Sequence, residues 1–235
     1  MPEYRLAWWW GPDGGLTGGP LPGGIVRLAV DYGGLAAFEC GILPGGGRTV
    51  LLADHAVPVP AGGGMEFRAP GLWTEMVVEE PGEYLSVGLE AFAVAVDDPD
   101  DAWRGGPDHL FRGERLPVGL DLGAERVAEP VEFAGSVGAT AIPCRVVGEV
   151  LVADEVYEVD GWGWWLDGQT PVGHLLGRDA DGGWVASSLP DAVETVGRAP
   201  VLGAGGTPVD RRLVRFAEGG RPGAAWVEEL GLLEG

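Results

Sequence analysis

The segments PCRVVGEVLVA at residues 143–153 and EVYEVDGWGWW at residues 155–165 decide the fold class of this chain. In both segments, apolar residues largely alternate with polar residues or glycine. This two-residue period is typical of a β-strand with one buried face. We therefore expect two strands here, one after the other.

The same period recurs along the chain, and clusters rich in Gly and Pro separate the segments that show it. The expected strands are 4–10, 25–32, 35–43, 49–53, 66–69, 73–80, 84–96, 118–127, 143–153, 155–165, 172–178, 183–188, 211–217 and 224–230. Short strands at this spacing predict an all-β fold, either an antiparallel barrel or a barrel-like sandwich. The only expected helix is the short segment Pro190–Gly197, and residues 97–115 are expected to be irregular. We expect one domain over residues 1–235, with two β halves that meet near residues 97–117 as the alternative.

The composition indicates a folded chain and excludes several functions that need Lys or Asn. The 235 residues include 43 Gly and 19 Pro, a share also found in disordered chains. However, 46 % of the residues are hydrophobic and 10 are Trp, which provides the apolar surface that a folded core needs. The chain has no Lys and no Asn. This excludes a Schiff-base lysine, a phosphate-binding lysine and an N-glycosylation site.

The chain is strongly acidic, with a net charge of −21. Such a charge repels nucleic acids and anionic membranes, so we expect neither as a partner. The residues after Met1 do not form a signal-peptide pattern, and no uncharged run approaches the roughly 20 residues that span a bilayer. We therefore expect a cytoplasmic protein, with Cys40 and Cys144 as reduced, buried thiols. The sequence does not indicate an oligomeric state.

Two tryptophan clusters are the most distinctive feature of the sequence. The first is Trp8–Trp10, and the second contains Trp162 and Trp164. Residues two apart on a strand share a face, so Trp8 and Trp10 point one way, as do Trp162 and Trp164. We expect the two pairs to line a cavity for a hydrophobic ligand, with an aromatic core that has no cavity as the alternative.

Acidic and histidine side chains near these clusters are the expected catalytic groups. Asp54 and His55 end an apolar strand, although adjacent strand residues face opposite sides. Asp167 follows the second Trp cluster, and His174 lies in another apolar strand. Apolar surroundings raise the pKa of a carboxyl group, which suits Asp54 or Asp167 to act as an acid. Each of these residues also has a purely structural interpretation, as a turn residue or a core histidine.

The sequence predicts no metal site and no cofactor. His55, His109 and His174 lack the paired spacing of zinc ligands. The acidic run Asp97–Asp101 lacks the spacing of an EF-hand loop, so a solvated turn is preferred to a calcium site.

The segment Ile142–Val152, running into Tyr157–Trp164, resembles lipocalin-like proteins related to carotenoid 1,2-hydratases (hydroxyneurosporene synthases). Lipocalin-like Diels–Alderases share that architecture, and Trp8–Trp10 resembles the aromatic start of this group. The resemblance implies a lipocalin-like barrel with an internal hydrophobic cavity. Where many relatives continue into an Asp-His-Ser-Trp-Gly-like run, this chain has Trp165-Leu166-Asp167-Gly168-Gln169, in which only Asp167 takes the acidic place.

We therefore expect a hydrophobic small molecule to bind in an aromatic-lined barrel cavity. The expected reaction is a cofactor-free cyclisation, isomerisation or hydration in secondary metabolism, promoted by the fold in which the substrate is held. The expected ligand-binding residues are Trp8, Trp10, Trp73, Trp162 and Trp164. The expected catalytic residues are Asp54, His55, Asp167 and His174. A non-catalytic carrier on the same scaffold and a filled structural barrel are the alternatives.

Overall fold

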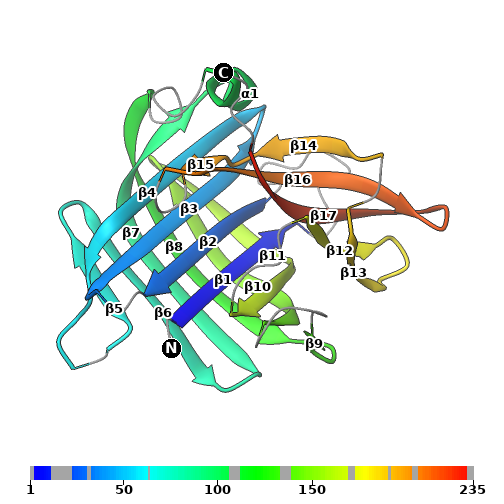
Figure 1. Cartoon of the computed structure of the whole chain (residues 1–235), viewed down its shortest axis with the longest axis horizontal. Coiled ribbons are helices and arrows are strands. Elements are labelled where there is room, and N and C mark those ends of the chain that lie inside the picture. The colour runs from blue at the N-terminus through cyan, green and yellow to red at the C-terminus, as the bar shows by residue number, and fades with distance from the viewer. Residues whose placement is uncertain are drawn as a thin grey trace.

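The chain folds into two antiparallel β-sheets and one short helix (Figure 1). The structure is a computed structural model that describes residues 3–11, 23–30, 33–62, 64–105, 112–132, 139–168, 173–189, 192–202 and 206–231. All fourteen expected strands are present among these residues, some with shifted ends. The prediction of an all-β antiparallel fold with very little helix is confirmed.

The larger sheet takes up the first two thirds of the chain. Its strands are β1 (Glu3–Trp10), β2 (Gly23–Val30), β3 (Leu35–Gly45), β4 (Arg48–Pro58), β5 (Glu66–Ala69), β6 (Leu72–Glu80), β7 (Tyr84–Val96), β8 (Glu114–Arg126), β9 (Val131–Glu132), β10 (Thr140–Val152) and β11 (Glu155–Asp167). The strand order is β4-β3-β2-β1-β11-β10-β8-β7-β6-β5, and β9 pairs with β10. The first strand of the chain therefore lies beside β11 (Figure 1).

The larger sheet curls into a barrel-like form. At one end β4 also pairs with β7, through Thr49 with Val96 and Leu51 with Val94, so the pairings of eight strands return to their start. Within the part of the chain that the structure describes, β4 and β7 pair over these few residues only. The concave side is filled by large buried side chains, among them Trp9, Phe38 and Trp165.

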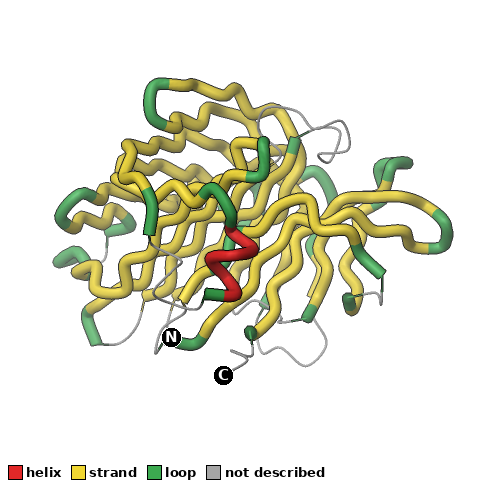
Figure 2. Tube along the Cα trace, turned by 90° about the horizontal axis from the view of Figure 1, so that it is seen from above, coloured by secondary structure: helices red, strands yellow, loops and turns green. Residues whose placement is uncertain are grey.

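The smaller sheet is built from the last quarter of the chain. Its strands are β12 (His174–Asp179), β13 (Trp184–Ser188), β14 (Glu194–Arg198), β15 (Val201–Leu202), β16 (Pro208–Glu218) and β17 (Arg221–Leu230). The order is β13-β12-β17-β16-β14, and β15 pairs with β16. The turn between β16 and β17 projects beyond the larger sheet at the right of Figures 1 and 2.

The smaller sheet covers part of the outer face of the larger one, and the two share a buried core. We call this core the sheet junction. Its fully buried members include Ile25, Leu43, Leu51, Trp164, Leu166, Leu176, Ala199, Leu213 and Trp226. The indole Nε1 of Trp226 donates a hydrogen bond of 3.0 Å to the backbone oxygen of Trp9, which ties the two sheets directly.

Strand alternation divides the side chains between these two cores. In β3, Phe38 and Cys40 face the concave side of the larger sheet, whereas Leu43 faces the sheet junction. In β11, Trp165 faces the concave side and Trp164 the sheet junction. Several strands of the larger sheet are therefore buried on both faces, which accounts for their nearly continuous apolar sequence.

Two expectations are corrected. The predicted helix Pro190–Gly197 is wrong, because Glu194–Arg198 forms β14 and pairs with β16; Pro190 and Asp191 lie outside the described residues. The segment expected to be irregular contains the helix α1 (Pro99–Arg104), red in Figure 2. Asp98 caps this helix by accepting a hydrogen bond of 2.8 Å from the backbone N–H of Asp101.

The two sheets do not divide at the seam that the alternative domain organisation placed near residues 97–117. The strands on either side of that segment, β7 and β8, are neighbours in the larger sheet. The chain passes from one sheet to the other between β11 and β12. The division of the chain into folding domains stays a prediction.

Candidate functional site

The second tryptophan cluster lies at the sheet junction. The ring of Trp184, on β13, meets Trp164 edge to face with centroids 5.2 Å apart, and meets Trp162 in the same way at 6.0 Å. Trp164 is 1 % exposed, whereas Trp162 and Trp184 are half-buried. We call the two half-buried rings, Trp162 and Trp184, the aromatic face.

These positions show which side of the larger sheet each tryptophan faces. Trp162 and Trp164 do share a side of β11, but it is the side that faces the smaller sheet. The tryptophans that face the concave side of the larger sheet are Trp9 and Trp165. The two-residue period shows which side chains share a face, but it does not show which face lies inside the barrel.

The first cluster lies beside the second in the sheet. In the pairing of β1 with β11, Trp8 lies opposite Trp164 and Trp10 lies opposite Trp162. The side chains of Trp8 and Trp10 lie outside the described part of the structure.

Trp73, the remaining expected ligand-binding residue, lies elsewhere. It is half-buried on the outer face of β6, over Gly88, and its Nε1 donates a hydrogen bond of 3.1 Å to Glu66. It lines an open groove of about 470 Å³ with residues of β7, β8, β10 and β11. The structure therefore does not bring Trp73 together with Trp162 and Trp164.

Arg178 of β12 completes the surroundings of the aromatic face. Its guanidinium carbon lies 3.8 Å from the centroid of Trp162 and 5.5 Å from that of Trp184. This is the range of cation–π contacts. Burial lowers the pKa of Arg178, and the charge of the neighbouring Asp179 partly offsets that effect. The sequence did not predict that Arg178 and Trp184 belong to this site. No motif in the sequence indicates that β12 and β13 pack beside the tryptophans of β11.

The four expected catalytic residues are not brought together. Asp54 accepts a hydrogen bond of 2.9 Å from the backbone N–H of Ala56, two residues further along β4. Asp167 is exposed at the end of β11. His174 is half-buried at the start of β12, opposite Ser188. Their catalytic roles stay predictions. His55 lies in a cluster of charged side chains.

That site is a charged cluster formed by Glu39, Arg211, Glu228, His55 and Arg27. Glu39 is 1 % exposed and Arg211 is 2 % exposed, although both are charged. Arg211 forms ion pairs with Glu39, across the sheet junction, and with Glu228, at 3.2 Å. One oxygen of Glu39 lies 3.1 Å from Nε2 of His55 and the other lies 3.2 Å from Arg27.

The electrostatics of the cluster keep Glu39 ionised. Burial alone raises the pKa of this carboxyl group, but Arg211, His55 and Arg27 together bring it well below its usual range. Burial alone lowers the pKa of Arg211, and Glu228 and Glu39 reverse that effect, so its pKa is raised. Mutual neutralisation is the condition under which such charges are tolerated in an interior.

His55 lies two residues from Ala53, which pairs with Glu39, so strand alternation places it on the same side as this cluster, next to a β-bulge. The register of β4 against β3 shifts between Ala36 and Phe38, so that Ala36 pairs with Val57 while Phe38 pairs with Asp54. The structure gives His55 a contact with the buried carboxylate of Glu39, and its side chain stays 29 % exposed. An imidazole held in this way can transfer protons with a group that approaches from the solvent side.

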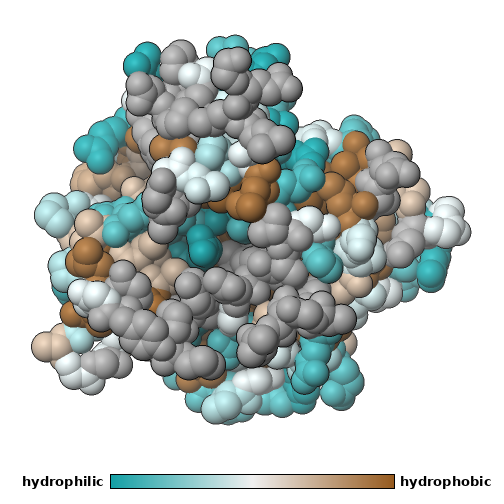
Figure 3. All heavy atoms as spheres, in the orientation of Figure 1, coloured by the Kyte–Doolittle hydropathy of each residue, from teal (hydrophilic) through white to brown (hydrophobic). Residues whose placement is uncertain are grey.

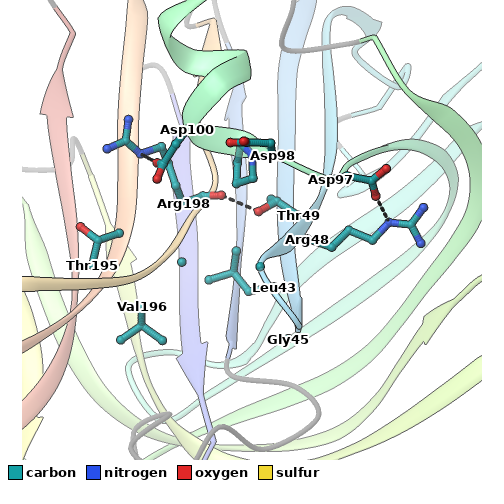
Figure 4. Close-up of a pocket in the computed structure, with 13 residues that line it drawn as sticks. Leu43, Gly45, Arg48, Thr49, Asp97, Asp98, Asp100, Thr195, Val196 and Arg198 are labelled. Carbon is teal, nitrogen blue, oxygen red and sulfur yellow. Dashed lines mark hydrogen bonds and ion pairs between the residues drawn. The ribbon is translucent and has the colours of Figure 1, made fainter.

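A separate pocket of about 320 Å³ lies where the β3–β4 turn meets α1 and β14 (Figure 4). Its charged side chains pair with one another. Arg48 lies 3.0 Å from Asp97, and Arg198 lies 3.0 Å from Asp100. Thr49 donates a hydrogen bond of 2.7 Å to the backbone oxygen of Arg198. These contacts fasten α1 and β14 to the larger sheet.

No protein-family profile and no curated protein sequence matches this chain. Among solved structures, the chain is similar to a crystal structure from Nitrosomonas europaea named "putative AttH", with a TM-score of 0.55. The match covers 98 % of this chain and 92 % of that one, at 11 % sequence identity. At this identity the likeness concerns the fold alone.

Two further observations hold for the described part of the chain. None of its helices is long and apolar enough to cross a membrane. Its His, Cys, Asp and Glu side chains form no group of three or more that could hold a metal ion.

Proposed function

We propose that this protein binds a hydrophobic small molecule at the aromatic face, between the two sheets. The observation that carries the proposal is the exposure of Trp162 and Trp184. They are half-buried, while Trp9, Trp164, Trp165 and Trp226 are at most 1 % exposed. Large aromatic rings left partly in water beside a cation are typical of binding sites.

The surface and the charge of the molecule bear on the class of ligand. In the view of Figure 3, hydrophobic residues gather over the smaller sheet beside hydrophilic ones. The net charge of −21 argues against nucleic acid as the ligand. The relationship to carotenoid 1,2-hydratases and lipocalin-like Diels–Alderases, and the cytoplasmic location, are parts of the proposal that rest on the sequence.

A fluorescence titration with N-phenyl-1-naphthylamine, a neutral apolar probe, tests the proposal. We expect saturable binding to the wild type and a loss of about tenfold or more in affinity for Trp162→Ala and Trp184→Ala, since each removes an aromatic wall. Trp73→Ala is the matched control, because it removes another half-buried indole far from the aromatic face. Circular dichroism checks that each variant is folded.

Two results would contradict this location for the ligand. The first is affinity that is unchanged in both Trp162→Ala and Trp184→Ala. The second is a loss of affinity in Trp73→Ala alone, which would place the ligand in the groove on the outer face of the larger sheet.

A second function, proton-transfer catalysis, is favoured by the contact of 3.1 Å between Glu39 and His55. A buried carboxylate that orients a partly exposed imidazole is a recurring arrangement in general acid–base catalysis. Liquid chromatography with mass spectrometry of polyenes incubated with the protein tests it. Hydration adds the mass of one water, whereas cyclisation or isomerisation changes the retention time alone.

We expect His55→Gln to abolish product formation, and His174→Gln serves as the control on the other sheet. Product formation that survives His55→Gln would exclude the histidine as the proton-transfer group. Ligand binding without any product in the wild type would leave the carrier function.

A further inference from the structure

Arg178 is unusual among the arginines of this chain. The chain has 36 acidic residues for its 15 basic ones, and most of its arginines form an ion pair. Among the described residues, no carboxylate forms an ion pair with Arg178. Arg112 and Arg115 also lack one within that part, but both are exposed, so water solvates them. Arg178 is half-buried.

The adjacent acidic residue is engaged elsewhere. Asp179 accepts a hydrogen bond of 2.7 Å from the backbone N–H of Gly183, and it lies 3.3 Å from Arg221. Nε of Arg178 is buried and, among the described groups, has no hydrogen-bond partner. A guanidinium that is partly removed from water without an acceptor is unfavourable unless another group completes the site.

The contacts of Arg178 place a ring on one face of its guanidinium and a turn beside Nη2. Trp162 covers one face of the guanidinium at 3.8 Å, while the N–H groups of a guanidinium point outward in its plane. The β12–β13 turn comes close to this edge at Gly182, whose φ is +89°. A Cβ atom there would lie 2.9 Å from Nη2 of Arg178. The positive φ favours glycine at this point, and the short distance shows how closely the turn approaches the guanidinium.

We propose that the ligand of the aromatic face is an anion, a carboxylic acid with a flat or polyene apolar body, whose carboxylate pairs with Arg178. A guanidinium accepts a carboxylate in its plane through two parallel hydrogen bonds and stacks on an aromatic ring with its face. Trp162 provides the stacking contact, and the carboxylate would pair with the outer N–H groups of Arg178. The inference rests on the proposed function, because the apolar body would lie on Trp162 and Trp184.

Displacement of N-phenyl-1-naphthylamine by two isosteric competitors tests the charge. 2-Naphthoate and 2-naphthamide share the same ring system, and only the first is an anion. We expect 2-naphthoate to displace the probe from the wild type at a concentration at least about tenfold lower than that of 2-naphthamide, because only 2-naphthoate forms the charge-assisted pair. Arg178→Gln should remove this preference, measured within that variant as the ratio of the two displacing concentrations, so that a change in its affinity for the probe does not affect the comparison.

Two variants serve as controls. Arg145→Gln changes the net charge by the same amount on the exposed surface of β10, where Arg145 pairs with Asp160, and should keep the preference. Arg178→Lys keeps the charge but not the planar guanidinium, and should retain part of the preference.

The outcomes separate the two proposals. Saturable probe binding with equal displacement by both competitors, or a preference that persists in Arg178→Gln, overturns the anion and leaves the aromatic site. Absence of saturable probe binding overturns the proposed function. In that case, calorimetric titration of the wild type with 2-naphthoate tests whether the protein binds the anion directly. Absence of binding heat would reject the proposed anion.

Discussion

Glu39 shows how a charged side chain is kept inside this protein. It occupies a position between Phe38 and Cys40 in a strand that is otherwise apolar. Arg211 from the smaller sheet and Arg27 from the neighbouring strand neutralise it. A buried ion pair adds little net stability by itself, but removing one partner leaves the other charge uncompensated. The two sheets therefore depend on both members being present.

Glu39→Gln should lower the free energy of unfolding by about 3 kcal/mol, because it leaves the buried Arg211 with one carboxylate in place of two. Urea denaturation followed by circular dichroism measures the change. Glu66→Gln is the control: Glu66 contacts Arg68 on the exposed side of β5, where water screens the pair, so its loss should cost much less. A loss as small in Glu39→Gln would show that the cluster does not hold the sheets together.

The stability of the protein should depend on pH because of the carboxyl group of Glu39. The pKa of Glu39 is lower in the folded protein than the value of about 4.3 in an unfolded chain. The stability that it contributes is therefore present above that unfolded value and is lost as the pH falls towards the folded pKa. Urea denaturation between pH 7 and pH 3 should show a steeper loss below about pH 5 in the wild type than in Glu39→Gln. Parallel curves for the two proteins would contradict this assignment.

At the scale of elements, β3 contacts β14 and the residue that follows β14 at two glycine positions. A Cβ atom at Gly41 would lie 2.6 Å from Cβ of Ala199, and one at Gly197 would lie 2.7 Å from Leu43. These glycines let the backbones of the two sheets approach more closely than any side chain would allow. The sheet junction is therefore narrow where β14 and β15 cross β3 and β4.

Gly41→Ala should destabilise the protein by about 1–3 kcal/mol, since the new methyl group forces Ala199 or Ile25 to move. Thermal unfolding measures the change. Gly64→Ala is the matched control, because a Cβ atom there would meet no atom within 4 Å. It should leave the stability unchanged or raise it slightly. If the two variants unfold at the same temperature, the contact with Ala199 is looser than described.

The strands could be predicted from the sequence because each is long and has a clear period. The segment Tyr84–Val96 was predicted with the observed bounds. The helix at Pro190–Gly197 was wrong because an acidic start and a glycine stop also fit β14, whose partner β16 is distant in sequence. The helix α1 had a usable signal, Asp98 before Pro99, which is a common N-cap and first position.

The candidate site was predicted in part, for a physical reason. The neighbours Trp162 and Trp164 and the histidine His55 are visible in the sequence as local patterns. The contact of Glu39 with Arg211 joins positions far apart in the chain, and no local period indicates it. Charged residues inside apolar strands are the one signal that points to such contacts.

At the scale of the whole molecule, the two sheets share one buried core. Trp164 and Leu166 come from the larger sheet, and Leu176, Leu213 and Trp226 come from the smaller one. Neither sheet can unfold without exposing the apolar residues of the other. We therefore expect a single cooperative transition.

Calorimetry and two spectroscopic probes can check this expectation. Far-ultraviolet circular dichroism follows both sheets, whereas tryptophan fluorescence largely follows the sheet junction and the concave core. The two curves should coincide, and the calorimetric and van't Hoff enthalpies should agree. Two separate transitions would instead indicate two folding units.

The pairing of β1 with β11 has a consequence for synthesis of the chain. Arg5 lies opposite Asp167 in the register of the two strands. Strand β1 therefore cannot pair with its second neighbour until most of the protein has been synthesised. Until then its edge is open, and an open strand edge invites association with other chains. Contacts of such long sequence separation also slow folding. Refolding from denaturant should therefore be slow, and its yield should fall as the protein concentration rises.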